Sequence, residues 1–131
     1  MNSRSLEVSG LAHNAPIPLG ARVGPLICSS GIAGKDASTG VLPADAATQV
    51  TLAFSNMDLL LAAGGASLAH LVKLTIYVKD NSLRDLINIE WLARFPHPHD
   101  RPARHILVSD LQHGMWLQLE VMAFITSTPT V

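Results

Sequence analysis

The strongest constraint on the fold is a change in the spacing of apolar residues between two neighbouring segments. From Ala44 to Ala63 they recur at helical spacing, in the set Val50, Ala53, Phe54, Met57, Leu60 and Leu61. From Leu71 to Lys79, the residues Val72, Leu74, Ile76 and Val78 alternate with polar ones, as in a strand with one buried face. Gly64 and Gly65 supply a helix stop between the two segments, because glycine tolerates the conformation of a C-cap. The fold therefore contains both helix and sheet.

The rest of the chain extends this pattern. We expect strands near residues 17–23, 25–30, 104–108 and 116–125, and a second helix that runs from a cap at Asp80 or Ser82 to about Phe95. That helix should turn one side to the core, with Leu83, Leu86, Ile87, Trp91 and Leu92. The order β-β-α-β-α-β-β predicts an α+β fold, in which two helices pack on one face of a mixed β-sheet. We expect a single domain over residues 1–131.

Composition narrows the classes of function. Charged residues make up 15% of the chain, whereas a soluble domain usually has about 25%. Hydrophobic residues make up 48%, and we expect the extra apolar surface to form a subunit interface in a homo-oligomer. The net charge is −1, and the nine Lys and Arg residues are scattered. This pattern disfavours nucleic-acid binding, which usually needs a strongly basic face.

The cysteine count, the apolar runs and the histidine spacing indicate where the protein is located and whether it binds metal. Cys28 is the only cysteine, so it forms no internal disulfide, and within an apolar strand we expect it to be buried. No apolar run approaches the roughly 20 residues of a membrane span, and residues 1–10 lack the apolar core of a signal peptide. His97 and His99 match no standard ligand spacing. We therefore expect a cytoplasmic protein without metal or membrane association.

Arg104 is the strongest candidate for a functional side chain. It follows an irregular loop over residues 96–102 and enters a strand, a junction where scaffolds commonly present binding groups. Its guanidinium can hold a carboxylate through two parallel hydrogen bonds. The alternative is an internal salt bridge to Glu120, Glu90 or Asp100, and the residues alone leave both interpretations open.

Four other positions can contribute to such a site. Ser30 and Gly31 follow a strand, where small residues let a ligand approach the backbone or simply form a tight turn. Asn88 lies inside a helix, which suits either a specific hydrogen bond or a solvent-facing position. Glu120 can orient a water or act as an acid or base, or it can be a structural partner of the arginine.

Taken in chain order, these pieces resemble the Rid family (reactive intermediate deaminases, YjgF-type) over roughly residues 17–125. The segments are Ser29-Ser30-Gly31, Thr39-Gly40, Gln49, Ala62-Ala63-Gly64, Val72-Lys73-Leu74-Thr75, Asn88, Arg101-Pro102-Ala103-Arg104 and Glu120. The resemblance implies a fold similar to chorismate mutase of the bacillar type and a homotrimer with its sites between subunits. It also implies hydrolysis of imines and enamines to ketones and ammonia, without metal or organic cofactor.

The resemblance also assigns roles to residues. Arg104 stands where the family's arginine binds the substrate carboxylate, and the backbone near Ile106 helps to hold the same group. Ser30 and Gly31 line the pocket near the reacting nitrogen and the water, and Asn88 is the family's helix asparagine. We therefore expect three catalytic residues, Arg104, Glu120 and Ser30. Five more should contact the substrate: Gly31, Asn88, Ile106, Gln118 and Ile17.

Two positions depart from the family pattern. Many members have a tyrosine in the N-terminal segment that lines the pocket, whereas this chain has Ile17 between two prolines. Many also carry an acid-x-acid pattern in the last strand, where this chain has Gln118 before Glu120. The activation of water therefore depends either on Glu120 or on a backbone group.

A narrower resemblance concerns the substrate. Several segments look like those of the 2-aminomuconate deaminase type, namely residues 13–18, 22–24, 29–32, 95–96, 101–105 and 114–115. Such enzymes act on an enamine dicarboxylate, so a second group must hold the far carboxylate. Arg22, His105 and Arg101 remain open as that group. The alternatives are a general 2-iminoacid deaminase and a non-catalytic regulator that binds a small metabolite.

Overall fold

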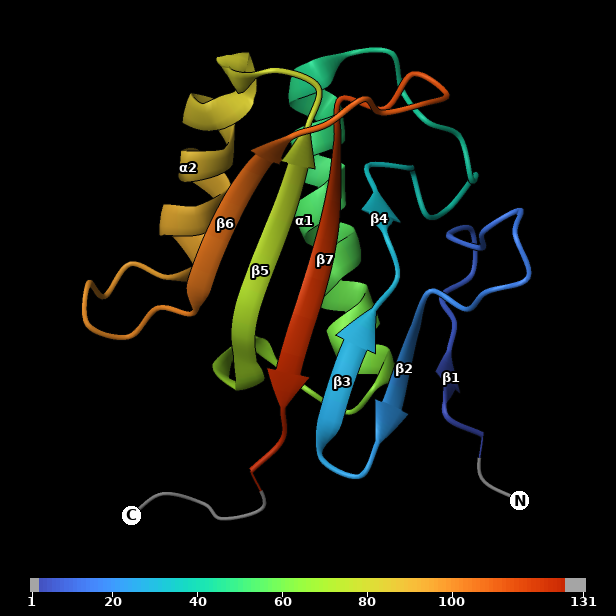
Figure 1. Cartoon of the computed structure of the whole chain (residues 1–131), viewed down its shortest axis with the longest axis vertical. Coiled ribbons are helices and arrows are strands. Elements are labelled where there is room, and N and C mark those ends of the chain that lie inside the picture. Colours follow the sequence, from blue (N-terminus) through green and yellow to red (C-terminus); the bar gives the residue numbers. More distant parts are fainter. Residues whose placement is uncertain (1–2, 127–131) are drawn as a thin grey trace.

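The computed structural model describes residues 3–126, which form one mixed sheet with two helices on one face (Figure 1). In chain order the elements are β1 (Ser5–Leu6), β2 (Gly20–Val23), β3 (Leu26–Ser29), β4 (Ile32–Ala33), α1 (Ala46–Ala63), η1 (Leu68–His70), β5 (Leu71–Val78), η2 (Asn81–Leu83), α2 (Arg84–Arg94), β6 (Ala103–Val108) and β7 (Leu117–Phe124). The strands follow the order β1-β2-β3-β7-β5-β6, and β4 pairs with β7. Among these strands β5 and β6 pair in parallel, and the other pairs are antiparallel. The expected α+β architecture is confirmed.

Capping residues mark both ends of helix α1. The Asp45 carboxylate accepts a hydrogen bond from the Thr48 backbone N–H at 2.9 Å, which satisfies one of the free donors of the first turn. At the other end, Gly65 adopts a φ of +80°, which an L side chain rarely tolerates. The six apolar residues expected to face the core are all buried.

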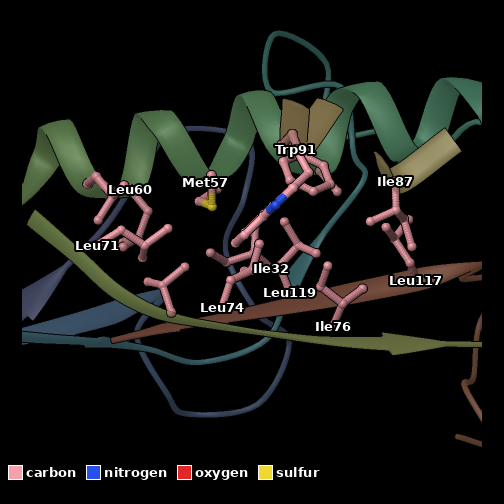
Figure 2. Packing of buried hydrophobic residues seen from close by; sticks show 14 of the residues in the cluster. Ile32, Met57, Leu60, Leu71, Leu74, Ile76, Ile87, Trp91, Leu117 and Leu119 are labelled. Carbon is pink, nitrogen blue, oxygen red and sulfur yellow. The ribbon is translucent and has the colours of Figure 1, made fainter. Parts of the chain in front are cut away.

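The core lies between the helices and one face of the sheet. Figure 2 shows side chains from α1 and α2 meeting those of β4, β5 and β7. In β7 burial alternates strictly, with Leu117, Leu119, Val121 and Ala123 buried and the residues between them at least partly exposed. This alternation confirms the expected division of that strand into a core face and an open face.

Three expectations about burial are wrong. Val72 is 48% exposed, because the pairing of β5 with β7 shifts between Leu71 and Lys73, so that Leu71 takes the core position. Leu92 is exposed on α2, whose buried side is narrower than its apolar stripe. Cys28 is exposed, because its neighbour Ile27 faces the core and successive strand residues point to opposite faces.

The open face of the sheet carries apolar side chains that one chain leaves uncovered. Leu26 pairs with Phe124, and Cys28 pairs with Met122, at the two ends of the β3–β7 ladder. Leu26, Met122 and Phe124 are each between 41% and 47% exposed. Among the described helices, none combines the length and the apolarity that a membrane crossing requires.

Candidate functional site

Arg104 is held against helix α2. It pairs in β6 with the buried Leu74 of β5, so its side chain lies on the helix-covered face of the sheet. Its Nη1 donates a hydrogen bond to Asn88 Oδ1 at 2.8 Å, and its Cζ lies 5.0 Å from the centroid of the Trp91 ring. Because Asn88 and Trp91 are three residues apart, they lie on one face of the helix and fix the guanidinium from two directions.

No carboxylate of residues 3–126 pairs with Arg104. Both ion pairs in that range belong to Arg94, which contacts Asp58 at 2.9 Å and Glu90 at 2.8 Å. Glu120 pairs with Thr75 and lies on the open face, on the other side of the sheet. Within the described residues, the alternative of an internal salt bridge is therefore wrong.

The electrostatics of Arg104 reflect this missing partner. Burial lowers the pKa of Arg104 from its ordinary value, and the positive charge of nearby Arg84 lowers that pKa further. An arginine still keeps its proton throughout the physiological range of pH. The site therefore presents a partly desolvated cation that a ligand carboxylate would neutralise.

A second group of the expected residues lies beside a cavity of about 440 Å³. Gly31 and Gln118 line it, together with the loop that precedes β2 and the loop that precedes β7. A Cβ at position 31 would collide with Gln118 Nε2, so any larger residue at position 31 would displace the Gln118 side chain from its present position. Ser30, the neighbour of Gly31, donates its backbone N–H to Leu19 at 2.8 Å.

The remaining expected residues are Ile106, Ile17 and Glu120, and none of them lines this cavity. Ile106 is on the same face of β6 as Arg104 and packs against the core. Ile17 is 46% exposed in the loop before β2, outside the cavity lining. Glu120 lines a smaller hollow of about 240 Å³ on the open face, where Tyr77 donates a hydroxyl hydrogen bond to it at 3.4 Å.

One chain therefore divides the expected site between two faces of its sheet. Arg104, Asn88 and Ile106 are on the helix-covered side of the edge strand β6. Gly31, Gln118 and Glu120 belong to the opposite side, across β5. These two groups do not form one pocket within a single chain.

Sequence reasoning missed three cationic or titratable side chains at the larger cavity, His13, Lys35 and His113. His13 Nε2 is buried without a hydrogen-bond partner in the described residues. His113 has a φ of +61°, which is rare outside glycine. The signals were indirect, because these residues are far apart in the chain and lie in loops of mixed composition.

Two of the groups considered for a second carboxylate are engaged elsewhere. Arg22 donates to the carbonyl oxygens of Gly24 at 2.9 Å and Gly64 at 2.7 Å. Arg101 donates to the Phe95 carbonyl oxygen at 2.9 Å. His105 is exposed on the open face and pairs with Thr75. Within residues 3–126, no group of three or more His, Cys, Asp or Glu gathers as a metal site would require.

Known proteins resemble this chain along most of its length. The family model described as Endoribonuclease L-PSP matches residues 13–125. The 2-iminobutanoate/2-iminopropanoate deaminase of Escherichia coli is 31% identical over 118 residues, which cover 85% of this chain and 92% of that protein. A RutC family protein of Haemophilus influenzae is 28% identical over 119 residues, covering 85% of this chain and 92% of that protein.

Solved structures agree with the fold. RidA from an Antarctic Psychrobacter species has a TM-score of 0.84 at 25% identity, covering 95% of this chain and all of that chain. The YjgF gene product of E. coli has a TM-score of 0.81 at 26% identity, covering 95% of this chain and 98% of that one. The expected chorismate-mutase-like fold is thereby confirmed.

Proposed function

The chain belongs to the Endoribonuclease L-PSP family, also called the Rid or YjgF family, and we propose that it hydrolyses the imine or enamine of a carboxylic acid. The products are a keto acid and ammonia. The E. coli relative named as an imine deaminase supports this class of reaction. The observation that carries the proposal is Arg104, a partly buried cation that Asn88 and Trp91 hold in place and that has no ion-pair partner in residues 3–126.

The reaction needs positioning more than a strong nucleophile. An enamine first takes a proton on carbon to become the iminium. Water then adds its oxygen to the iminium carbon while losing a proton, and the C–N π electrons move to nitrogen. The carbinolamine nitrogen then takes a proton and leaves as ammonia when the C–N bond breaks, while the hydroxyl oxygen loses its proton and forms the C=O bond of the keto acid. Holding the substrate beside the water removes much of the entropic barrier.

We assign roles from the two groups of residues. Arg104 binds the carboxylate next to the imine carbon, and Asn88 keeps the guanidinium oriented. Gly31 lets the reacting nitrogen and the water approach the backbone, with Ser30 beside it. Glu120 is the candidate proton acceptor for the water, while Gln118 provides hydrogen bonds only.

We propose that two copies of the chain supply these groups to each site, within a homotrimer. The opposite placement of Arg104 and Gly31 in the sheet supports this arrangement. The uncovered apolar open face, with Leu26, Met122 and Phe124, supports an interface there.

Mixing two inactive variants tests the shared site. Arg104→Ala removes the carboxylate clamp, and Gly31→Val blocks the cavity side, so each variant alone should be inactive. In randomly mixed cyclic trimers, about a quarter of the sites would combine two intact halves and recover activity. Size-exclusion chromatography with light scattering should show three chains per particle. Absence of recovery in confirmed mixed trimers would contradict a site shared between chains.

The deaminase proposal is tested by generating an imine in place. An amino-acid oxidase produces 2-imino acids from amino acids, and their decay and the release of ammonia are timed with and without the protein. We expect Arg104→Ala to lower kcat/KM at least about a hundredfold, because charge-assisted hydrogen bonds are lost. Arg4→Ala, which removes an exposed arginine, is the control. Full activity in Arg104→Ala would overturn the proposal.

The preferred substrate is a separate question. We propose 2-aminomuconate or a similar enamine acid, from the resemblance of the loop segments. A general 2-iminoacid deaminase is the alternative, and the name of the E. coli relative favours it. Comparing kcat/KM for 2-aminomuconate and 2-iminopropanoate decides between them.

Two functions other than deamination can be distinguished by experiment, namely metabolite sensing and RNA cleavage. Tight binding of a small carboxylate with no turnover would indicate a metabolite-sensing regulator. The family description names an endoribonuclease, but the net charge of −1 gives no electrostatic footprint for RNA. We expect no RNA cleavage by nuclease-free preparations.

A further inference from the structure

We propose that the cavity beside Gly31 and Gln118 holds a second acidic group of the substrate, bound by Lys35, His13 and His113. The site would then prefer dicarboxylates over monocarboxylates that share the same carbon chain. This inference rests on the proposed function, in which Arg104 takes the carboxylate next to the reacting carbon.

His13 gives the most direct indication of a missing ligand. Its Nε2 is buried and has no hydrogen-bond partner among the described residues. Buried polar atoms are nearly always paired, because an unpaired one has lost its water without compensation. Since His13 lines the cavity, a rotation of its imidazole toward the cavity would let a ligand oxygen supply the missing partner.

Lys35 supplies a positive charge that the described chain leaves uncompensated. Its ammonium forms no ion pair within residues 3–126. The neighbouring Asp36 carboxylate forms no ion pair with it, and Asp36 Oδ1 instead accepts from the backbone N–H and the hydroxyl of Ser38 at 2.9 and 2.6 Å. The lining of the cavity contains no Asp or Glu, so its net charge favours an anion.

Two buried polar residues of α1 hold the walls of the cavity in place. Asn56 is 1% exposed and donates to the carbonyl oxygens of Ala33 at 2.9 Å and Lys35 at 2.8 Å. Gln49 is fully buried, and it donates to Gly114 at 3.0 Å and accepts from the Trp116 N–H at 2.8 Å. The segment that follows β4 and the loop that precedes β7 are therefore held in place from the core side, which makes the cavity preorganised.

The shape of the lining identifies the chemical class of the occupant. Leu11, Leu19, Ile32 and Leu42 form apolar walls, which suit a carbon chain. The left-handed backbone at His113 sets an imidazole at the same cavity, and such strain persists where the surrounding structure imposes it. A cavity whose lining combines apolar side chains with cationic and hydrogen-bonding groups fits a carbon chain that carries a terminal carboxylate.

A matched pair of unreactive acids tests this inference without turnover. Muconate and sorbate share a six-carbon diene, and muconate has the additional terminal carboxylate. We expect isothermal titration to show that the wild-type protein binds muconate at least about tenfold more tightly than sorbate. Lys35→Met and His13→Leu should each reduce this preference, and Lys35→Arg should retain most of it. Lys79→Met removes an exposed lysine outside the lining and should leave the preference unchanged.

The outcomes separate this inference from the proposed function. Equal binding of the two acids by the wild-type protein would overturn it, as would an equal loss for both acids in Lys35→Met. In either case imine hydrolysis in the oxidase assay would still support the deaminase. Conversely, a Lys35-dependent preference without imine hydrolysis would support the second acid site and contradict the deaminase. Thermal unfolding of every variant checks that the binding changes are not caused by loss of the fold.

Discussion

Arg94 and Arg104 lie against similar aromatic surroundings, but only Arg94 forms ion pairs among the described residues. Each guanidinium lies over an aromatic ring, with Arg94 Cζ 5.3 Å from the Phe54 centroid and Arg104 Cζ 5.0 Å from the Trp91 centroid. Arg94 pairs with the carboxylates of Asp58 and Glu90. Arg104 contacts only the neutral Asn88 amide oxygen among the described polar partners.

The difference appears in the pKa of each guanidinium. Burial acts to lower the pKa of Arg94, but the hydrogen bonds and charges of Asp58 and Glu90 outweigh it, and the pKa is raised. Burial also lowers the pKa of Arg104, and there no carboxylate offsets it. A structural arginine is thus neutralised inside the fold, whereas Arg104 keeps its charge available for a ligand.

Exchanging each arginine for lysine should produce the largest contrast. Lysine keeps the charge and loses the planar fork, so Arg104→Lys should lower kcat/KM about thirtyfold while thermal stability changes little. Arg94→Lys should leave kcat/KM unchanged and lower the free energy of unfolding by about 1 kcal/mol. Steady-state kinetics and urea unfolding measure the two effects. Similar kinetic losses in both variants would contradict the distinction.

Asn88→Asp would give Arg104 the internal carboxylate that Arg94 already has. The new carboxylate would compete with the substrate carboxylate, so we expect KM to rise about tenfold while stability holds or increases. Asn88→Leu, which removes the acceptor without adding charge, is the matched control. An unchanged KM in Asn88→Asp would mean that substrate does not bind at this guanidinium.

Asp58→Asn tests the reverse change. It removes one carboxylate from Arg94 and should lower the free energy of unfolding by at most about 1 kcal/mol, because Asp58 is 41% exposed. It should create no new affinity for carboxylates, since Glu90 still occupies the guanidinium. Chemical denaturation and the oxidase assay check both expectations, and a change in kcat/KM would argue against a purely structural Arg94.

The smallest effect concerns Asp45, a carboxylate that pairs with neither arginine. Hydrogen bonds from the Thr48 side chain and backbone lower the pKa of Asp45 from its ordinary value of 3.8. The ionised cap therefore stabilises the fold above that value, and this stabilisation is lost as the pH falls through the lowered pKa. Asp45→Asn should lower Tm at neutral pH, with the difference from wild type shrinking in acid. A difference that stays constant with pH would exclude the ionised cap as its cause.

Local periodicity made most of the fold predictable. The apolar spacing of α1 and the alternation of β7 each correspond to one buried face, and both were confirmed. The bulge at Val72 was not predictable, because an extra residue in one strand leaves no distinct mark in the alternation. The exposure of Cys28 and Leu92 was missed because apolar residues indicate burial without saying whether the same chain provides it.

The geometry of the candidate site was not predictable from the sequence. Arg104 and Asn88 are 16 positions apart, and their hydrogen bond follows from the packing of α2 against β6. The division of the site between two faces depends on strand order, which single-chain patterns do not specify. The cavity with His13, Lys35 and His113 was missed because three separate loops form it.

The charge requirement of Arg104 is the most direct test of the account. We would compare kcat/KM for a 2-imino acid with that for its uncharged primary amide, in the wild-type protein, Arg104→Ala and Arg94→Ala. The wild-type protein and Arg94→Ala should both prefer the acid, because a free guanidinium binds its carboxylate. Arg104→Ala should process the acid and the amide at similar, low rates. A preference for the acid that survives in Arg104→Ala would contradict the account.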